Sequence, residues 1–174
     1  MAAFDQTLPP ALAAANALDY DYNDGNGVDF EPYTEFQSAD DNASWIRAWT
    51  GNDELDGAEY RVFGQDGTGG YAAFWITRAL EPLTAQPIVF FGSEGELGVV
   101  ARNLNDYLWL LAGGLGPLEA VGFDEEYEDK EIQMEFADLA AEHAAADEKK
   151  AREVIRLARA EFPDFEATIR ALCR

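Results

Sequence analysis

Four short apolar segments between residues 60 and 101, separated by glycine-containing or proline-containing connections, constrain the fold more than any other feature. Two of them flank the turn GQDGTGG and two flank the turn GSEG. Tight turns between apolar runs predict antiparallel hairpins. The runs YAAFWIT and PIVFF are apolar on both faces, so we expect helices to cover both sides of the central strands. The predicted strands of this meander are 60–63, 71–77, 88–91 and 97–101.

The clearest helix follows the last of these strands. Asn103 is a good N-cap, Asp106 stands three residues later as in a capping box, and the pair Gly113-Gly114 ends the helix. Apolar residues recur at the spacing of one helix face, and neighbouring positions are apolar too. We therefore expect this helix to be buried on two sides.

Further helices are predicted before and after the meander. The segment 8–18 is rich in alanine, and 39–49 is bounded by Ser38 and Gly51. A short strand is expected near 28–30. After an acidic loop at 122–131, three helices are predicted at about 132–146, 149–162 and 164–173.

These elements predict an α+β fold, with an antiparallel sheet of about four to six strands packed by helices and a C-terminal helical segment. Residues 1–121 would form the α+β domain. Residues 122–174 would form an acidic loop and C-terminal helices packed on the same domain.

The charge of the chain limits its partners. There are 34 acidic and 12 basic residues, a net charge of −22, which disfavours binding to nucleic acid and to anionic lipid. A basic protein is the expected partner. Residues 149–174 hold 4 acids and 7 bases, against 30 and 5 in the rest, so this part should lie against the acidic body. Its arginines 152, 156 and 159 are predicted to face outward.

The chain offers few signs of targeting or of catalysis. The start MAAFDQTLPP lacks the parts of a secretion signal, and the longest apolar stretch is too short to span a bilayer, so we expect a cytoplasmic protein. The single histidine, His143, is predicted to face solvent on a helix, and Cys173 to be a packed thiol. Ser93 lacks the glycine of a nucleophile elbow. We expect a non-enzyme without a cofactor.

Two alternatives remain open. Asp19, Asp21 and Asn23 match the first three ligands of an EF-hand loop, although Asp24 replaces the required glycine and Phe30 the final glutamate. A calcium-binding protein or a carboxylate-dependent hydrolase is therefore one alternative, since so many acids make close carboxylate pairs common. A general acidic regulatory scaffold is the other.

The candidate partner-binding residues are Asp66, Glu94 and Glu96. They occupy the tips of the two predicted hairpins and should gather at one end of the sheet. There they would meet Lys or Arg of a partner, or serve as ordinary turn residues. The four tryptophans fall on predicted core faces.

The stretch 69–114, from GGYAAFWITR through QPIVFFGSEGELGVVARNLNDYLWLLAGG, resembles the SUKH superfamily. This Smi/Knr-type family includes yeast cell-wall-synthesis regulators and bacterial immunity proteins. The resemblance lies in the order of parts: an aromatic strand after a glycine-rich turn, a strand ending in a Gly/acid turn, a further strand, and a helix that opens with Asn103-Leu104-Asn105-Asp106-Tyr107-Leu108. Of the family's N-terminal signature, the chain carries only Leu8-Pro9.

The resemblance implies an α+β protein-binding scaffold without catalytic residues. Bacterial members resemble antidotes that bind a delivered toxin, often a nuclease. Nuclease domains are commonly basic because they hold phosphates, and an acidic inhibitor can occupy such a cleft. The predicted function is thus a non-catalytic protein-binding module that neutralises a basic toxin by masking its active cleft with an acidic surface.

Overall fold

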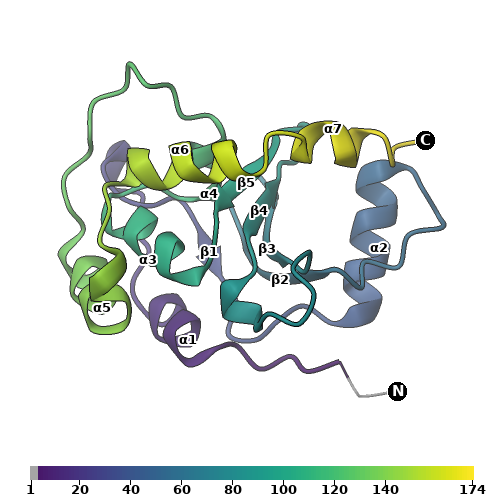
Figure 1. Ribbon diagram of the computed structural model, residues 1–174, viewed down its shortest axis with the longest axis horizontal. Helices are drawn as coiled ribbons and strands as arrows, with labels where there is room; N and C mark the ends of the chain where they lie inside the picture. Colours follow the sequence, from purple (N-terminus) through teal and green to yellow (C-terminus); the bar gives the residue numbers. More distant parts are fainter. Residues whose placement is uncertain (1–3) are drawn as a thin grey trace.

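The computed structural model describes residues 4–174 and contains one five-stranded antiparallel sheet between two groups of helices (Figure 1). The strands lie in the order β1-β2-β3-β4-β5, so each pairs with its neighbours in the sequence. This architecture confirms the predicted α+β class. The strands are β1 (Glu31–Pro32), β2 (Tyr60–Gln65), β3 (Tyr71–Trp75), β4 (Ile88–Phe91) and β5 (Leu97–Ala101).

Seven α-helices surround this sheet in the described part of the chain. They are α1 (Pro10–Asn16), α2 (Ala39–Thr50), α3 (Leu104–Ala112), α4 (Pro117–Val121), α5 (Met134–Ala144), α6 (Ala151–Glu161) and α7 (Phe165–Arg170). Short 3-10 turns are η1 (Asn23–Gly25), η2 (Leu83–Ala85) and η3 (Ala145–Asp147). The acidic segment predicted as a loop, 122–131, contains no helix or strand.

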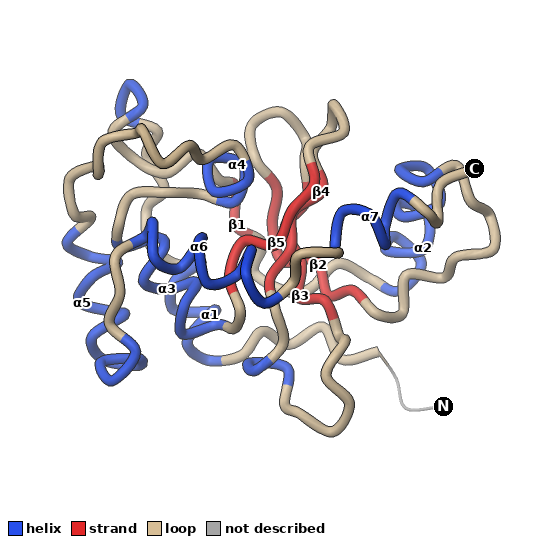
Figure 2. Tube along the Cα trace, turned by 45° about the horizontal axis from the view of Figure 1, so that its top comes forward, coloured by secondary structure: helices blue, strands red, loops and turns tan. Residues whose placement is uncertain are grey.

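Alternating strand residues build two separate cores. Phe74 and Phe90 point into the first core, with α1, α3 and α5. Ala73, Val89 and Phe91 point into the second, with α2 and α7. Figure 2 shows the strands between these two groups of helices. The apolar character of YAAFWIT and PIVFF on both faces therefore reflects burial on both faces, as predicted.

Three strand boundaries differ from the sequence prediction, one of them the end of β2, which extends to Gln65 rather than residue 63. The first strand is β1, which begins at Glu31 rather than near residues 28–30. The ring of Phe30 occupies the space that a Cβ at Gly64 would fill, so the chain packs into the core before it pairs with β2. The third strand ends at Trp75, because the backbone N–H groups of Thr77 and Arg78 donate to the Gln86 side chain and leave the ladder.

Both predicted helix caps are present, although one differs in detail. Ser38 Oγ accepts from the Asp41 N–H at 3.1 Å, and Gly51 ends α2 with φ of 68°, a conformation that favours glycine. Asn103 Oδ1 accepts from the Asp106 N–H at 2.9 Å at the start of α3. The Asp106 carboxylate does not return to the backbone as in a capping box; it contacts Arg102 and Lys149.

The C-terminal helices pack on the rest of the molecule. Val154, Ile155 and Ala158 of α6 are buried, and α6 lies against β5 and α3. The last residues reach the far end of α2, where the Arg174 N–H donates to the Thr50 carbonyl at 3.0 Å.

Candidate functional site

Asp66 shapes the β2–β3 turn from inside it. Its side chain is 1% exposed, and its carboxylate accepts from the Gly70 N–H at 2.7 Å and from the Thr68 hydroxyl at 2.8 Å. A carboxylate in this position stabilises the turn and presents no surface to a partner. The structure therefore corrects the sequence-based choice of Asp66 as a contact residue.

The two other predicted contact residues lie in the β4–β5 turn. Glu94 is exposed and Glu96 is half-buried, with its carboxylate accepting from the Glu94 N–H at 3.1 Å. Ser93 donates to the Thr68 hydroxyl across 3.1 Å, so the two hairpin tips do touch. The tips gather at one end of the sheet, but Glu94 is the only one of the three predicted residues with an exposed carboxylate.

Most carboxylates of the protein face no cation. The eight ion pairs within residues 4–174 engage six of the 34 acidic side chains. The cations, in contrast, are largely used within the fold. Arg47, Arg61 and Arg159, for example, donate to backbone carbonyls. The charge left for a partner is therefore almost entirely negative.

Two acidic segments far apart in the sequence meet at one end of the molecule. Lys130 Nζ lies 3.3 Å from the Gly27 carbonyl oxygen, and Gln133 Nε2 lies 3.1 Å from that of Asn26. These bonds join segment 19–31 to segment 124–131. We call the exposed carboxylates of the two segments the acidic end. Its members are Asp19, Asp21, Asp24, Glu31, Asp124, Glu125, Glu126, Glu128, Asp129 and Glu131.

The sequence alone predicts an acidic loop at 122–131 and shows an aspartate-rich stretch at 19–24, but it does not predict their contact. Their contact depends on the polar residues Lys130 and Gln133, which are separated from residues 26–27 by about a hundred positions. No local pattern marks such a pair. The alternation of acids with Tyr20, Phe30 and Phe123, which are mostly or fully buried, is the one signal that ties these segments to a common core.

Two arginines of α6 bind the second acidic segment and the residues just before it. Arg152 Nε donates to Asp129 at 2.7 Å, and its NH2 group donates to the Tyr127 carbonyl at 2.8 Å. Arg159 donates to the carbonyls of residues 120, 121 and 123. The hydrogen bond from Arg152 also lowers the pKa of Asp129. Arg156 and Arg159 are exposed, as predicted, whereas Arg152 is partly buried against the segment that it binds.

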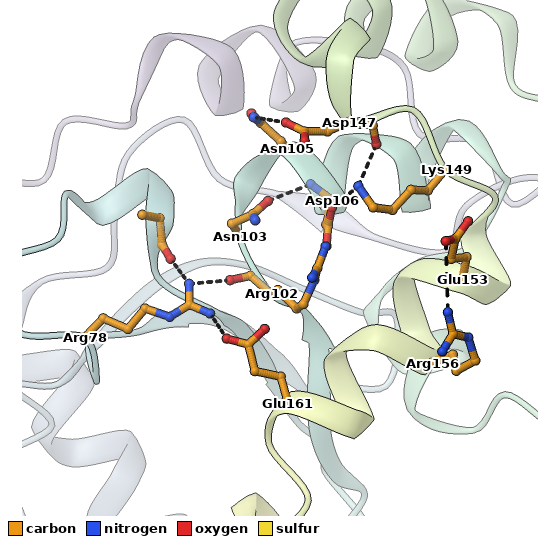
Figure 3. Close-up of polar contacts among 11 residues, drawn as sticks. Arg78, Arg102, Asn103, Asn105, Asp106, Asp147, Lys149, Glu153, Arg156 and Glu161 are labelled. Carbon is orange, nitrogen blue, oxygen red and sulfur yellow. Dashed lines mark hydrogen bonds and ion pairs between the residues drawn. The ribbon is translucent and has the colours of Figure 1, made fainter.

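A buried charge cluster ties the start of α3 to the start of α6 (Figure 3). Asp106 is 1% exposed and faces Arg102 Nε at 2.8 Å and Lys149 Nζ at 3.0 Å. The hydrogen bond to Asp106 raises the pKa of Arg102. Asn105 donates to Asp147 at 2.9 Å, on the same junction. A buried carboxylate between two cations, one from each side of the junction, ties the C-terminal helices to α3.

The other residues singled out in the sequence have the surroundings of turn, surface and core side chains. Asp21 accepts from the Asn23 N–H at 2.8 Å, as in an Asx-turn. His143 is exposed on α5, and the Cys173 thiol lies 3.7 Å from the Ile169 carbonyl oxygen. Among the described residues, no three His, Cys, Asp or Glu side chains are placed to share a metal ion. Trp45 and Trp109 are buried; Trp49 and Trp75 are partly buried against the second core.

Comparison with protein-family models, with curated proteins and with solved structures gave no match to this chain. Within residues 4–174, no helix is both long enough and apolar enough to cross a lipid bilayer.

Proposed function

We propose that this protein is a non-catalytic binding module of the SUKH type that residues 69–114 resemble, and that it captures a basic protein. A basic toxin domain such as a nuclease is the proposed partner, and masking of its active cleft is the proposed mechanism. One observation carries the proposal: the fold uses its cations internally and leaves most of its 34 carboxylates facing solvent.

The acidic end is the proposed contact surface. It gathers carboxylates from two segments onto one end of the molecule, and it is held by Arg152, Arg159 and Lys130. A preformed surface loses little conformational entropy when it binds. A concentrated negative potential also attracts a basic protein from a distance and raises its association rate.

Affinity capture from the source cells, followed by mass spectrometry, tests this proposal. The bait carries Glu125→Gln, Glu126→Gln and Glu128→Gln, which remove three exposed charges from the acidic end. A control bait carries Glu35→Gln, Glu54→Gln and Glu142→Gln, which remove three exposed charges elsewhere. We expect one basic protein to bind the wild type and the control and to be lost with the first bait.

The captured protein is then mixed with the purified chain at increasing ionic strength. Electrostatic steering predicts an association rate that falls as salt rises, and inhibition of the partner at a one-to-one ratio. Failure to capture any basic protein, or an association rate independent of salt, contradicts the proposal.

A further inference from the structure

A cavity of about 730 Å³ lies between α3, α5, the start of α6 and the segment that follows α4. Its volume is within the range of small-molecule binding sites. Trp109 and Ala112 of α3 line it, with Phe123 and Ile132 from the segment between α4 and α5. Ile132 is 60% exposed, so the apolar wall of the cavity continues to the surface.

The rim of this cavity differs in charge from the rest of the molecule. Acidic residues outnumber basic ones almost three to one in the whole chain, but they are equal in number here. All three lysines of the chain line this one cavity. The charged lining residues are Lys130, Lys149, Lys150, Arg152, Glu128, Asp129, Glu148 and Glu153.

One carboxylate at the rim serves two cations. Asp129 lies 3.5 Å from Lys150 Nζ and 2.7 Å from Arg152 Nε. The other two nitrogens of the Arg152 guanidinium donate to the carbonyls of Glu125 and Tyr127. The Lys150 side chain is 77% exposed, and its ion pair with Asp129 is the only ion pair that it makes in the described part of the chain. An ammonium has three donors, so Lys150 can bind a second anion.

We infer that this cavity binds a single-chain apolar carboxylate, with its head group at Lys150 and its chain against Trp109 and Phe123. An apolar floor favours a hydrocarbon body, and Lys150, which shares its one carboxylate partner Asp129 with Arg152, favours a negative head group. The inference does not rest on the proposed function: Glu128 and Asp129 belong both to the acidic end and to the cavity rim, but the residues that would contact the ligand, Trp109, Phe123 and Lys150, are not part of the acidic end.

Calorimetric titration of the full chain tests the class of ligand. Decanoate, decanol and decyltrimethylammonium share one chain length and differ in head-group charge; each is used below its micelle-forming concentration. We expect saturable one-to-one binding that weakens in that order. From hexanoate to decanoate, affinity should rise by up to about fourfold for each methylene group buried. Absence of saturable decanoate binding, or equal or tighter binding of the ammonium, overturns the inference.

Variants test the placement of the ligand. Lys150→Gln should weaken decanoate binding about twofold to fivefold, as expected for an exposed ion pair, and leave decanol binding unchanged. Arg174→Gln removes an exposed charge that does not line the cavity and should change neither. Ile132→Asn, at an exposed position, should weaken both ligands. Equal affinities of wild type and Lys150→Gln for decanoate place the head group elsewhere and contradict the inference.

Discussion

At the scale of single residues, acidic side chains that look alike in the sequence have opposite roles. Asp66 and Glu94 both stand in hairpin turns, at tips that touch through Thr68 and Ser93. The carboxylate of Asp66 is buried and bonded to its own turn, whereas that of Glu94 is exposed. Only the first should matter for stability.

Replacing Asp66 by alanine should therefore lower the free energy of unfolding by about 1–3 kcal/mol, because the Gly70 N–H loses its partner in a buried turn. Glu94→Ala is the matched control and should change it by less than about 0.5 kcal/mol. Urea denaturation measures both. Equal effects of the two substitutions would contradict this role of Asp66.

Replacing Asp106 should lower the free energy of unfolding by more than replacing Asp66. Asp106→Asn removes the buried carboxylate that pairs with Arg102 and Lys149 and leaves Lys149 only its bond to the Asp147 carbonyl, so we expect the free energy of unfolding to fall by about 3–5 kcal/mol. Glu166→Gln breaks an exposed pair with Arg170 and should cost less than about 1 kcal/mol. Chemical denaturation of both variants compares the two pairs; similar losses would argue against Asp106 as the anchor.

At the scale of elements, short-range signals decided where helices begin and end. Ser38 and Gly51 bound α2 as expected from their chemistry, and Asn103 begins α3. Strands were located as well, because apolar runs between tight turns have few alternatives. Two of the boundaries that differ, β1 and the end of β3, depend on contacts outside the strand itself: Phe30 packs over Gly64, and Gln86 binds the chain after Trp75.

The cap of α2 can be tested directly. Ser38→Ala removes the acceptor for the Asp41 N–H and should lower stability by about 1 kcal/mol. Ser44→Ala, at an exposed interior position of the same helix, should be neutral or slightly stabilising because alanine is the better helix former. Thermal unfolding followed by circular dichroism distinguishes the two variants. If Ser38→Ala leaves Tm unchanged, the Ser38 cap does not stabilise α2.

At the scale of the whole molecule, repulsion among the excess acidic side chains destabilises the compact folded state. A net charge of −22 repels itself in the folded state, and only six carboxylates find a cation. Salt screens this repulsion over distances greater than about 10 Å at 0.1 M, while short ion pairs are screened less.

Raising salt from about 0.01 M to 0.1 M should therefore stabilise the protein by about 1 kcal/mol, or 2–4 °C in Tm. Calorimetry in NaCl and in KCl should give the same rise, because screening does not depend on the identity of the cation. A fall in Tm with salt would mean that the ion pairs outweigh the repulsion.

The sequence by itself determined the class of fold, the helix caps and the sign of the surface charge. Each of these depends on residue type and on neighbours within a few positions. Only the tertiary structure decided which acidic side chains are exposed to solvent and which are buried and stabilise the fold. Asp66 and Asp106 are buried because N–H groups and cations surround them. The acidic end exists because Lys130 and Gln133 reach residues 26–27 across the fold. Burial and long-range pairing are properties of the packed chain, and residue order alone does not contain them.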